Sequence, residues 1–299
     1  MKVRIGFGLG TRTQGAAGDR FLGIVDDLER LGFDSLWLSE RVSGEIPDPL
    51  IALAVAAGRT ERLKLGTSVL VVPGRNPVLL AKELASLDTL SKGRLLPAVG
   101  LGVVDPTEQQ AFGVRREDRA TLFDEVLPLL RRLWTGEPVD HDGPRYRLSG
   151  LRLQPTPVDG RLDVWLGGLA PSELRRCGRL GDGWLPSFCT ADDVAAGIPV
   201  VRSEAERHGR AIDPEHYGAL VAYRHGPLPD AYAAFVARRR PDVDPGTLIP
   251  EGLDGVAATI EAMVAAGASK FVVLPLTDPG DWTAELEAIA ATLLPLQTA

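Results

Sequence analysis

The stretch LKLGTSVLVVPGRNPVLLAKELASLDTLSKGRLLPAVGLG, residues 63–102, decides the fold. It opens on a β-branched apolar run, passes through a Pro/Gly loop into an apolar helical pattern at 78–90, and ends in a second apolar run at 95–100. This order predicts a strand, a helix and a second, parallel strand. Gly100 and Gly102 close the second strand, where bare backbone lets a ligand approach the end at which barrel enzymes keep their sites.

The same alternation runs along the whole chain. Strands are predicted at 3–9, 34–38, 64–70, 95–100, 164–167, 184–186, 217–223 and 271–274. Helices are predicted at 20–31, 49–59, 78–90, 118–134, 172–179, 192–208, 231–239, 254–266 and 282–294. Eight strands alternating with helices over 299 residues predict an α/β protein with a (β/α)₈ TIM barrel, which we expect to form one domain over residues 1–299.

An open doubly wound sheet is the alternative. It would need a G-x-G-x-x-G turn opening a helix, but Gly6, Gly8 and Gly10 have the spacing G-x-G-x-G. Two segments exceed a minimal barrel. Residues 136–150 predict a β-hairpin with its turn at Asp142-Gly143, and residues 225–252 predict a lid or a helical insertion. Pro97 lies inside a predicted strand, so we expect a local irregularity there.

Composition limits the partners. The net charge is −7, which argues against nucleic-acid binding through phosphates, and the basic run 238–240 is interpreted as a solvated helix end. No apolar run approaches the roughly 20 residues of a membrane span, and no signal-peptide pattern opens the sequence. Two cysteines are too few for a disulfide framework or a zinc site. We therefore expect a cytoplasmic protein without metal, nucleic-acid or membrane partners.

Residues 63–102 resemble the signature of the luciferase-like monooxygenase family, which also holds the deazaflavin (coenzyme F420)-dependent oxidoreductases. The matching positions are Leu65, Gly66, Thr67, Val69, Arg75, Pro77, Leu80, Ala81, Leu87, Asp88, Leu90, Ser91, Gly93, Arg94 and Gly100. The likeness continues through Glu108, Arg119 and Trp134 to VWLGG at 164–168 and GDGW at 181–184. The resemblance implies the barrel that the periodicity also predicts.

The resemblance also implies a cofactor site. The flavin or deazaflavin ring would lie at the C-terminal mouth, against a non-prolyl cis peptide at Ser68–Val69; the alternative is an ordinary trans strand end. The cofactor phosphate would bind amides after the fifth barrel strand; the alternative there is a plain turn capped by Ser172. The full set of expected cofactor-binding residues is Glu40, Arg41, Ser68, Val69, Gly100, Gly102, Gly167, Gly168, Leu169, Ala170 and Ser172.

The sequence differs from the deazaflavin dehydrogenases at the positions of their catalytic residues. Arg41 occupies the histidine position; it cannot shuttle protons but can hold a fixed positive charge toward a reduced ring. The alternative is that Arg41 pairs with Glu40 or Glu45. Val103 replaces the acid of the sugar-phosphate enzymes, so that substrate is not carried over, and Asp105 is the nearest candidate acid.

Other polar residues carry weaker signals. Among the four histidines, His225 is the only one predicted at the barrel rim, and Glu108 and Arg119 are explained equally well as a buried structural pair.

Three functions remain open at this point. The first is an F420-dependent oxidoreductase that moves a hydride to or from a small organic substrate. The second keeps the fold but uses FMN and oxygen as a monooxygenase. The third is a degenerate barrel that binds a flavin without turnover. No metal cluster or nucleophile motif points to a hydrolase. Family members form dimers through barrel helices, so the resemblance also implies a homodimer.

Overall fold

A computed structural model describes residues 2–10 and 18–298. Its main sheet has eight parallel strands in the order β8-β7-β4-β3-β2-β1-β10-β9, and bridges from Trp184 to Tyr217 and from Ser187 to Leu220 join the two outer strands. The predicted (β/α)₈ barrel is therefore confirmed. The strands are β1 (Arg4–Leu9), β2 (Ser35–Leu38), β3 (Lys64–Val71), β4 (Leu95–Gly100), β7 (Trp165–Leu166), β8 (Gly183–Trp184), β9 (Gly218–Tyr223) and β10 (Lys270–Pro275).

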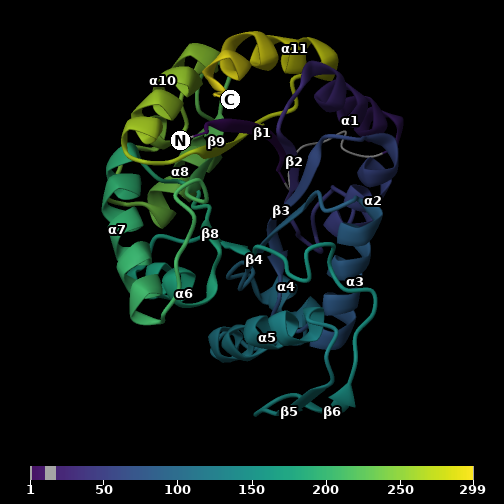
Figure 1. The fold of residues 1–299 in the computed structure, drawn as a ribbon. Coiled ribbons are helices and arrows are strands. Elements are labelled where there is room, and N and C mark those ends of the chain that lie inside the picture. Colours follow the sequence, from purple (N-terminus) through teal and green to yellow (C-terminus); the bar gives the residue numbers. More distant parts are fainter. Residues whose placement is uncertain (1, 11–17, 299) are drawn as a thin grey trace.

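Helices surround the strands on the outside (Figure 1). The nine predicted helices are α1 (Asp19–Leu31), α2 (Pro49–Arg59), α3 (Pro77–Leu90), α5 (Arg119–Trp134), α6 (Pro171–Leu180), α7 (Ala191–Arg207), α8 (Asp230–Arg239), α10 (Gly252–Ala265) and α11 (Trp282–Leu293). The prediction missed α4 (Pro106–Ala111) and α9 (Pro245–Leu248), which are too short to show a period; a 3₁₀ turn follows at Leu294–Leu296. None of the described helices is long and apolar enough to cross a membrane.

The barrel interior is filled by tryptophans packed over glycines. Trp37 on β2 is fully buried, and a Cβ atom at Gly66 would lie 2.3 Å from its ring. Gly6 faces the same indole, with 2.9 Å from a Cβ to Nε1. Trp165 on β7 lies edge-on to Trp37 at 6.4 Å. Because the interior is close-packed, bare backbone on β1 and β3 is what admits the indole of Trp37.

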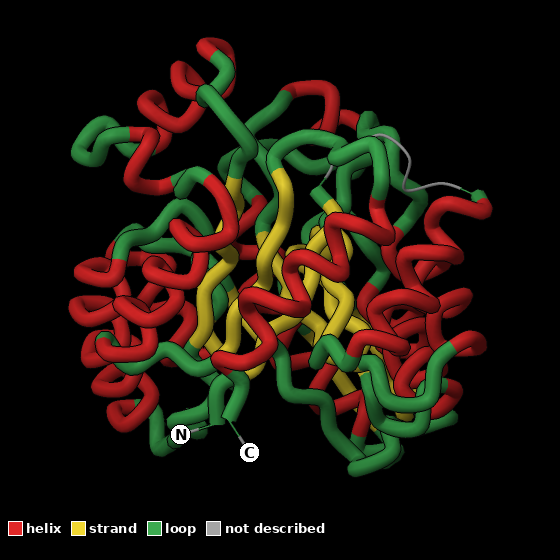
Figure 2. The backbone as a smooth tube through the Cα atoms, turned by 90° about the horizontal axis from the view of Figure 1, so that it is seen from above, coloured by secondary structure: helices red, strands yellow, loops and turns green. Residues whose placement is uncertain are grey.

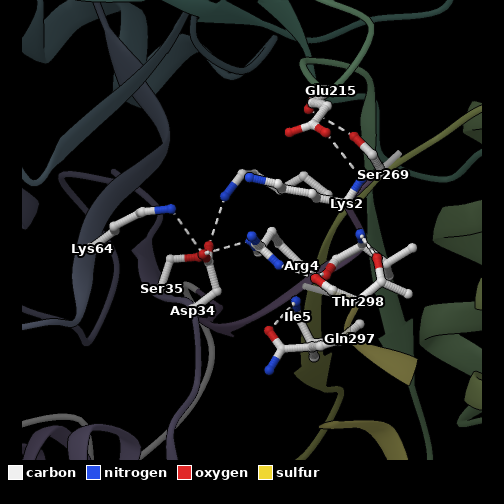
Figure 3. A network of polar contacts seen from close by, with 12 residues as sticks. Lys2, Arg4, Ile5, Asp34, Ser35, Lys64, Glu215, Ser269, Gln297 and Thr298 are labelled. Carbon is white, nitrogen blue, oxygen red and sulfur yellow. Dashed lines mark hydrogen bonds and ion pairs between the residues drawn. The ribbon is translucent and has the colours of Figure 1, made fainter. Parts of the chain in front are cut away.

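Charged side chains close the N-terminal end of the barrel. Asp34 precedes β2 and is largely buried between Lys270 Nζ at 2.7 Å and Lys64 Nζ at 2.9 Å, with Arg4 Nε at 3.9 Å. Figure 3 shows Lys64 and Arg4 pointing toward the Asp34 carboxylate. Burial raises the pKa of Asp34, but Lys270 and Lys64 outweigh it and hold the pKa at about 2, below the ordinary 3.8.

The two insertions have the predicted places. The hairpin consists of β5 (Val139–Asp142) and β6 (Arg147–Leu151) and projects beside α5 (Figure 1). Its connection is the four-residue segment 143–146, so Gly143 lies in the turn as predicted, whereas Asp142 still belongs to β5 and pairs with Arg147; the Gly143 amide donates to the Tyr146 carbonyl. Residues 225–252 form a helical insertion that contains α8 and α9.

The helical insertion lies after the C-terminal end of β9. In Figure 2 helical segments stand beyond the end of the strands opposite the two termini. Arg240, at the end of α8, is largely buried; it pairs with Asp193 at 2.9 Å and donates to the Phe188 carbonyl at 2.7 Å. The interpretation of the run 238–240 as a solvated helix end is therefore wrong for Arg240, because this side chain fastens the insertion to the start of α7.

Adding one methyl group at Gly66 should destabilise the barrel. Gly66→Ala places a Cβ 2.3 Å from the ring atoms of Trp37, and overpacking of this kind costs roughly 1–3 kcal/mol of unfolding free energy. Gly23→Ala on α1 is the control, because nothing lies within 4 Å of its Cβ. Urea unfolding measures both variants; equal stabilities would contradict this account of the interior.

Removing the charge of Asp34 should also destabilise the fold. Asp34→Asn leaves three cations around a neutral amide, which we expect to cost about 3 kcal/mol. Because the folded pKa lies below 3.8, the stabilisation is present above that pH and is lost as the pH falls toward 2. Asp142→Asn, whose side chain is exposed, is the control. Urea unfolding at neutral pH that gave the two variants the same stability would refute the role of the cluster.

Candidate functional site

The end of β3 carries a cis peptide bond between Ser68 and Val69, as the family resemblance predicts. Two hydrogen bonds from the segment after β2 hold the carbonyl groups of Ser68 and Val69. Ser39 Oγ donates to the Ser68 carbonyl at 2.9 Å, and the Glu40 amide donates to the Val69 carbonyl at 3.2 Å. The orientation of this peptide at the mouth is thus fixed from the neighbouring strand.

Val69 lies against the last residue of β4. A Cβ atom at Gly100 would come 2.7 Å from Val69 Cγ2, so glycine at this position makes room for the valine side chain. Val69 itself is only partly buried. The pair gives the mouth a small apolar platform.

The irregularity expected at Pro97 is not at that residue, because Pro97 pairs in register with Thr67. The register between β3 and β4 shifts on the other strand, between Ser68 and Leu70, after the Ser68–Ala98 pair. Thr67 Oγ1 accepts from the Ala98 amide at 3.0 Å and donates to the Ala98 carbonyl at 2.7 Å. The Thr67 side chain therefore satisfies both backbone polar groups of Ala98, the residue after the proline.

Glu40 follows β2 and is held by two donors. Its carboxylate accepts from the Val71 amide at 2.6 Å and from the guanidinium of Arg75. Burial, only partly offset by Arg75, raises the pKa of Glu40. A small, partly open cavity of about 20 Å³ adjoins Glu40, Gly102 and Val103, which is room for about one water and not for a ring.

Arg41 and Asp105, the two predicted catalytic residues, come together at the mouth. Arg41 Nη2 lies 3.1 Å from Asp105 Oδ2, and Arg41 Nε lies 3.6 Å from Glu108 Oε1. The alternative in which Arg41 pairs with Glu40 or Glu45 is therefore wrong.

Asp105 has structural partners on both oxygens. Oδ1 caps α4 by accepting from the Thr107 amide at 2.9 Å and the Glu108 amide at 3.3 Å, while Oδ2 faces Arg41. Cap and ion pair together fix the guanidinium against α4. Asp105 is therefore better suited to positioning Arg41 than to acting as a general acid.

Glu108 ties the loop after β2 to α4. It accepts from the Val42 amide at 3.0 Å, from the Ser43 amide at 2.9 Å and from Ser43 Oγ at 2.6 Å. Burial raises its pKa, but the hydrogen bonds from Ser43 and Val42 outweigh burial and lower the pKa of Glu108 below its usual range. Glu108 is therefore a carboxylate at neutral pH.

Arg119 does not pair with Glu108, so the expected buried structural pair is wrong. Both side chains are buried, but Arg119 Nη1 donates to the carbonyls of Gly102 at 2.9 Å and Val103 at 3.1 Å. Arg119 thereby fixes the backbone that follows β4, and Gly102 adopts a φ of 79° there. The two residues brace the same mouth from different loops.

The predicted phosphate site lies at the start of α6. Ala170 is the N-cap and Ser172 lies inside the first turn, so the alternative in which Ser172 caps the helix is wrong. The amides of Leu169 and Ala170 both donate to Glu173 Oε2 at 3.0 Å. Gly167 and Gly168 precede them, and Trp184 Nε1 donates to the Gly168 carbonyl at 3.0 Å. The two amides that were expected to bind a phosphate therefore already bind the Glu173 carboxylate.

His225 lies at the rim, as predicted, with partners that sequence reasoning missed. Its Nε2 is 2.8 Å from Glu285 Oε1 on α11, and the Tyr223 hydroxyl donates to the same carboxylate. Burial and Glu285 together raise the pKa of Tyr223. The GGLAPSE run could have revealed Glu173 as the residue whose carboxylate caps the start of the helix, but nothing local links Glu285 to His225, 60 residues away.

Comparison with known proteins shows that the chain is similar in sequence to a family of enzymes. Residues 3–234 match the model of the family described as luciferase-like monooxygenase. The F420-dependent glucose-6-phosphate dehydrogenase of Nocardia farcinica is 32% identical over 199 residues, which cover 62% of this chain and 58% of that protein. The 4-hydroxyprotoasukamycin monooxygenase of Streptomyces nodosus subsp. asukaensis is 32% identical, over 65% of this chain and 55% of that protein. The chain thus spans less than two thirds of the length of these relatives.

A solved structure supports the fold over the full chain. The F420-dependent secondary alcohol dehydrogenase in complex with an F420-acetone adduct has a TM-score of 0.83 and 19% identity, and the alignment covers 100% of both chains. At this identity the likeness concerns the fold alone.

Truncating Glu108 should loosen the loop after β2. Glu108→Ala removes the acceptor of two partly buried amides and a hydroxyl, so we expect about 1–2 kcal/mol of destabilisation. Amide hydrogen exchange at Val42 and Ser43 should accelerate at least tenfold more than at residues of β9. Glu117→Ala, whose side chain is exposed, is the control. Unchanged exchange at both amides would show that Glu108 does not hold this loop.

Proposed function

Because the chain belongs to the luciferase-like monooxygenase family, we propose that it is a coenzyme F420-dependent oxidoreductase. It transfers a hydride between a deazaflavin and a small organic substrate. The single observation that carries the proposal is the partly exposed Val69 side chain beside the bare backbone of Gly100 at the C-terminal mouth. The relatives named F420-dependent glucose-6-phosphate dehydrogenase support the choice of cofactor.

The mouth fits the ring portion of such a cofactor. Val69 is partly exposed beside the bare backbone of Gly100, so a flat apolar ring can rest on this platform. Ser39 holds the carbonyl of Ser68, and Glu40 and Gly102 line the small cavity nearby. The predicted phosphate positions at Gly167, Gly168, Leu169, Ala170 and Ser172 fit less well, because Glu173 occupies the amides.

The protein's own residues orient the reactants and set the local charge. When bound, the deazaflavin supplies the hydride chemistry, while the chain contributes binding and electrostatics. Arg41 holds a fixed positive charge at the mouth, and Asp105 positions it through the 3.1 Å ion pair. Arg41 and both oxygens of Asp105 are engaged by the ion pair and by the cap of α4, so the proton donor of the reaction is another residue, solvent or the substrate.

An FMN-dependent monooxygenase is the second candidate function. The 32% identity to 4-hydroxyprotoasukamycin monooxygenase favours it specifically. The same ring platform serves both cofactors. A barrel that binds the ring without turnover is the third possibility, and it predicts binding with no redox activity on any substrate.

We also propose a cytoplasmic homodimer without nucleic-acid or membrane partners. Ile51 and Val55 on α2 and Leu79 on α3 are exposed apolar side chains on neighbouring barrel helices, which suits a second copy of this chain as partner. Cys177 and Cys189 are buried free thiols, in keeping with a reducing compartment. The barrel face at α2 and α3 leaves the C-terminal mouth open to a small-molecule substrate.

Titration of the purified apo-protein with F420 and with FMN tests the proposal through ligand fluorescence. Gly100→Ala should weaken binding of the preferred ring about tenfold, because the added Cβ displaces Val69 from the platform. Gly23→Ala is the matched control and should bind normally.

The outcomes separate the candidates. Preference for F420 supports the oxidoreductase, and preference for FMN moves the protein to the monooxygenase. Binding of neither ring rejects both functions.

A further inference from the structure

The turn between β7 and α6 contains an anion position filled by the chain itself. Glu173 Oε2 accepts from the amides of Leu169 and Ala170, each at 3.0 Å. Gly168 lies beneath the same carboxylate with a φ of 98°, and a Cβ there would come 2.5 Å from Glu173 Oε2. The bare backbone at Gly168 therefore accommodates a carboxylate of this chain.

A cofactor phosphate and the Glu173 carboxylate need the same donors. Backbone amides at the start of a helix bind anions because their N–H groups are unpaired and the helix dipole favours negative charge. With Glu173 in place, both amides are already satisfied. A phosphate would have to displace a charge-assisted cap, or approach a like charge within a few ångströms.

We propose that Glu173 is a specificity-determining residue that withholds this anion position from the cofactor's phosphate. This inference rests on the proposed function, because it concerns the tail of the ring-bearing cofactor. Binding energy then comes from the ring at Val69 and Gly100, and the chain gains little from the cofactor's phosphate. The proposed ring site lies at the end of β3 and the anion position follows β7. These two strands are separated in the sheet by β4.

The test compares two ligands that differ only in a phosphate. Apo-protein is titrated with ribityl 8-hydroxy-5-deazaflavin and with its 5′-monophosphate, following ligand fluorescence. Wild-type protein should bind both within about threefold. Glu173→Ala should prefer the monophosphate about tenfold, since both amides become free, at a cost of about 1 kcal/mol for the lost helix cap.

Two further variants control for charge and for cap geometry. Glu173→Gln keeps an acceptor for the cap but removes the charge, so its preference should lie between wild type and Glu173→Ala. Glu61→Gln removes one negative charge from an exposed side chain before β3, at the opposite end of the barrel, and should behave as wild type. A monophosphate preference of thirtyfold in wild type that Glu173→Ala leaves unchanged would overturn the proposal.

Inorganic phosphate separates this inference from the proposed function. Failure of all variants to bind either ring ligand would reject the cofactor assignment. The Glu173 proposal would then be decided by thermal unfolding in phosphate and in chloride at equal ionic strength. Stabilisation by phosphate in Glu173→Ala and not in wild type supports the proposal; the same response in both proteins overturns it.

Discussion

The packing of Trp37 over Gly6 and Gly66 is the constraint on which the rest of the structure depends. The indole fills the barrel interior only because β1 and β3 present bare backbone to it, with a hypothetical Cβ at Gly66 only 2.3 Å from the ring. Trp165 meets it edge-on at 6.4 Å and ties β7 to the same centre. Strands held in this way end together at one mouth, and that mouth gathers Ser68, the loop after β2 and the start of α4 into one site.

At the mouth, too, a glycine makes room for a larger side chain. Gly100 leaves room for Val69 as Gly66 leaves room for Trp37, and the result is a platform instead of a filled core. Charge then organises the loops around it. Glu108 and Asp105 hold the segment that contains Arg41, and Glu40 is held by Arg75 from the other side. The site is thus built from side chains whose own polar groups are satisfied by the scaffold.

Sequence reasoning predicted the parts of this molecule that have a local cause. Eight strands and nine helices follow from hydrophobic period, and the family signature located the cis peptide at Ser68–Val69. The misses concern pairing between distant segments. Arg240 with Asp193 and Arg41 with Asp105 are 47 and 64 residues apart, and no local pattern specifies which charges a folded chain will bring together. The short helix α4 escaped because six residues show no period.

A crystal structure of the protein with bound deazaflavin would test the central claim most directly. The account predicts that the ring lies on Val69, beside the backbone of Gly100, with the guanidinium of Arg41 facing the ring. A ring bound elsewhere on the barrel, or one that leaves the Ser68–Val69 peptide untouched, would contradict it.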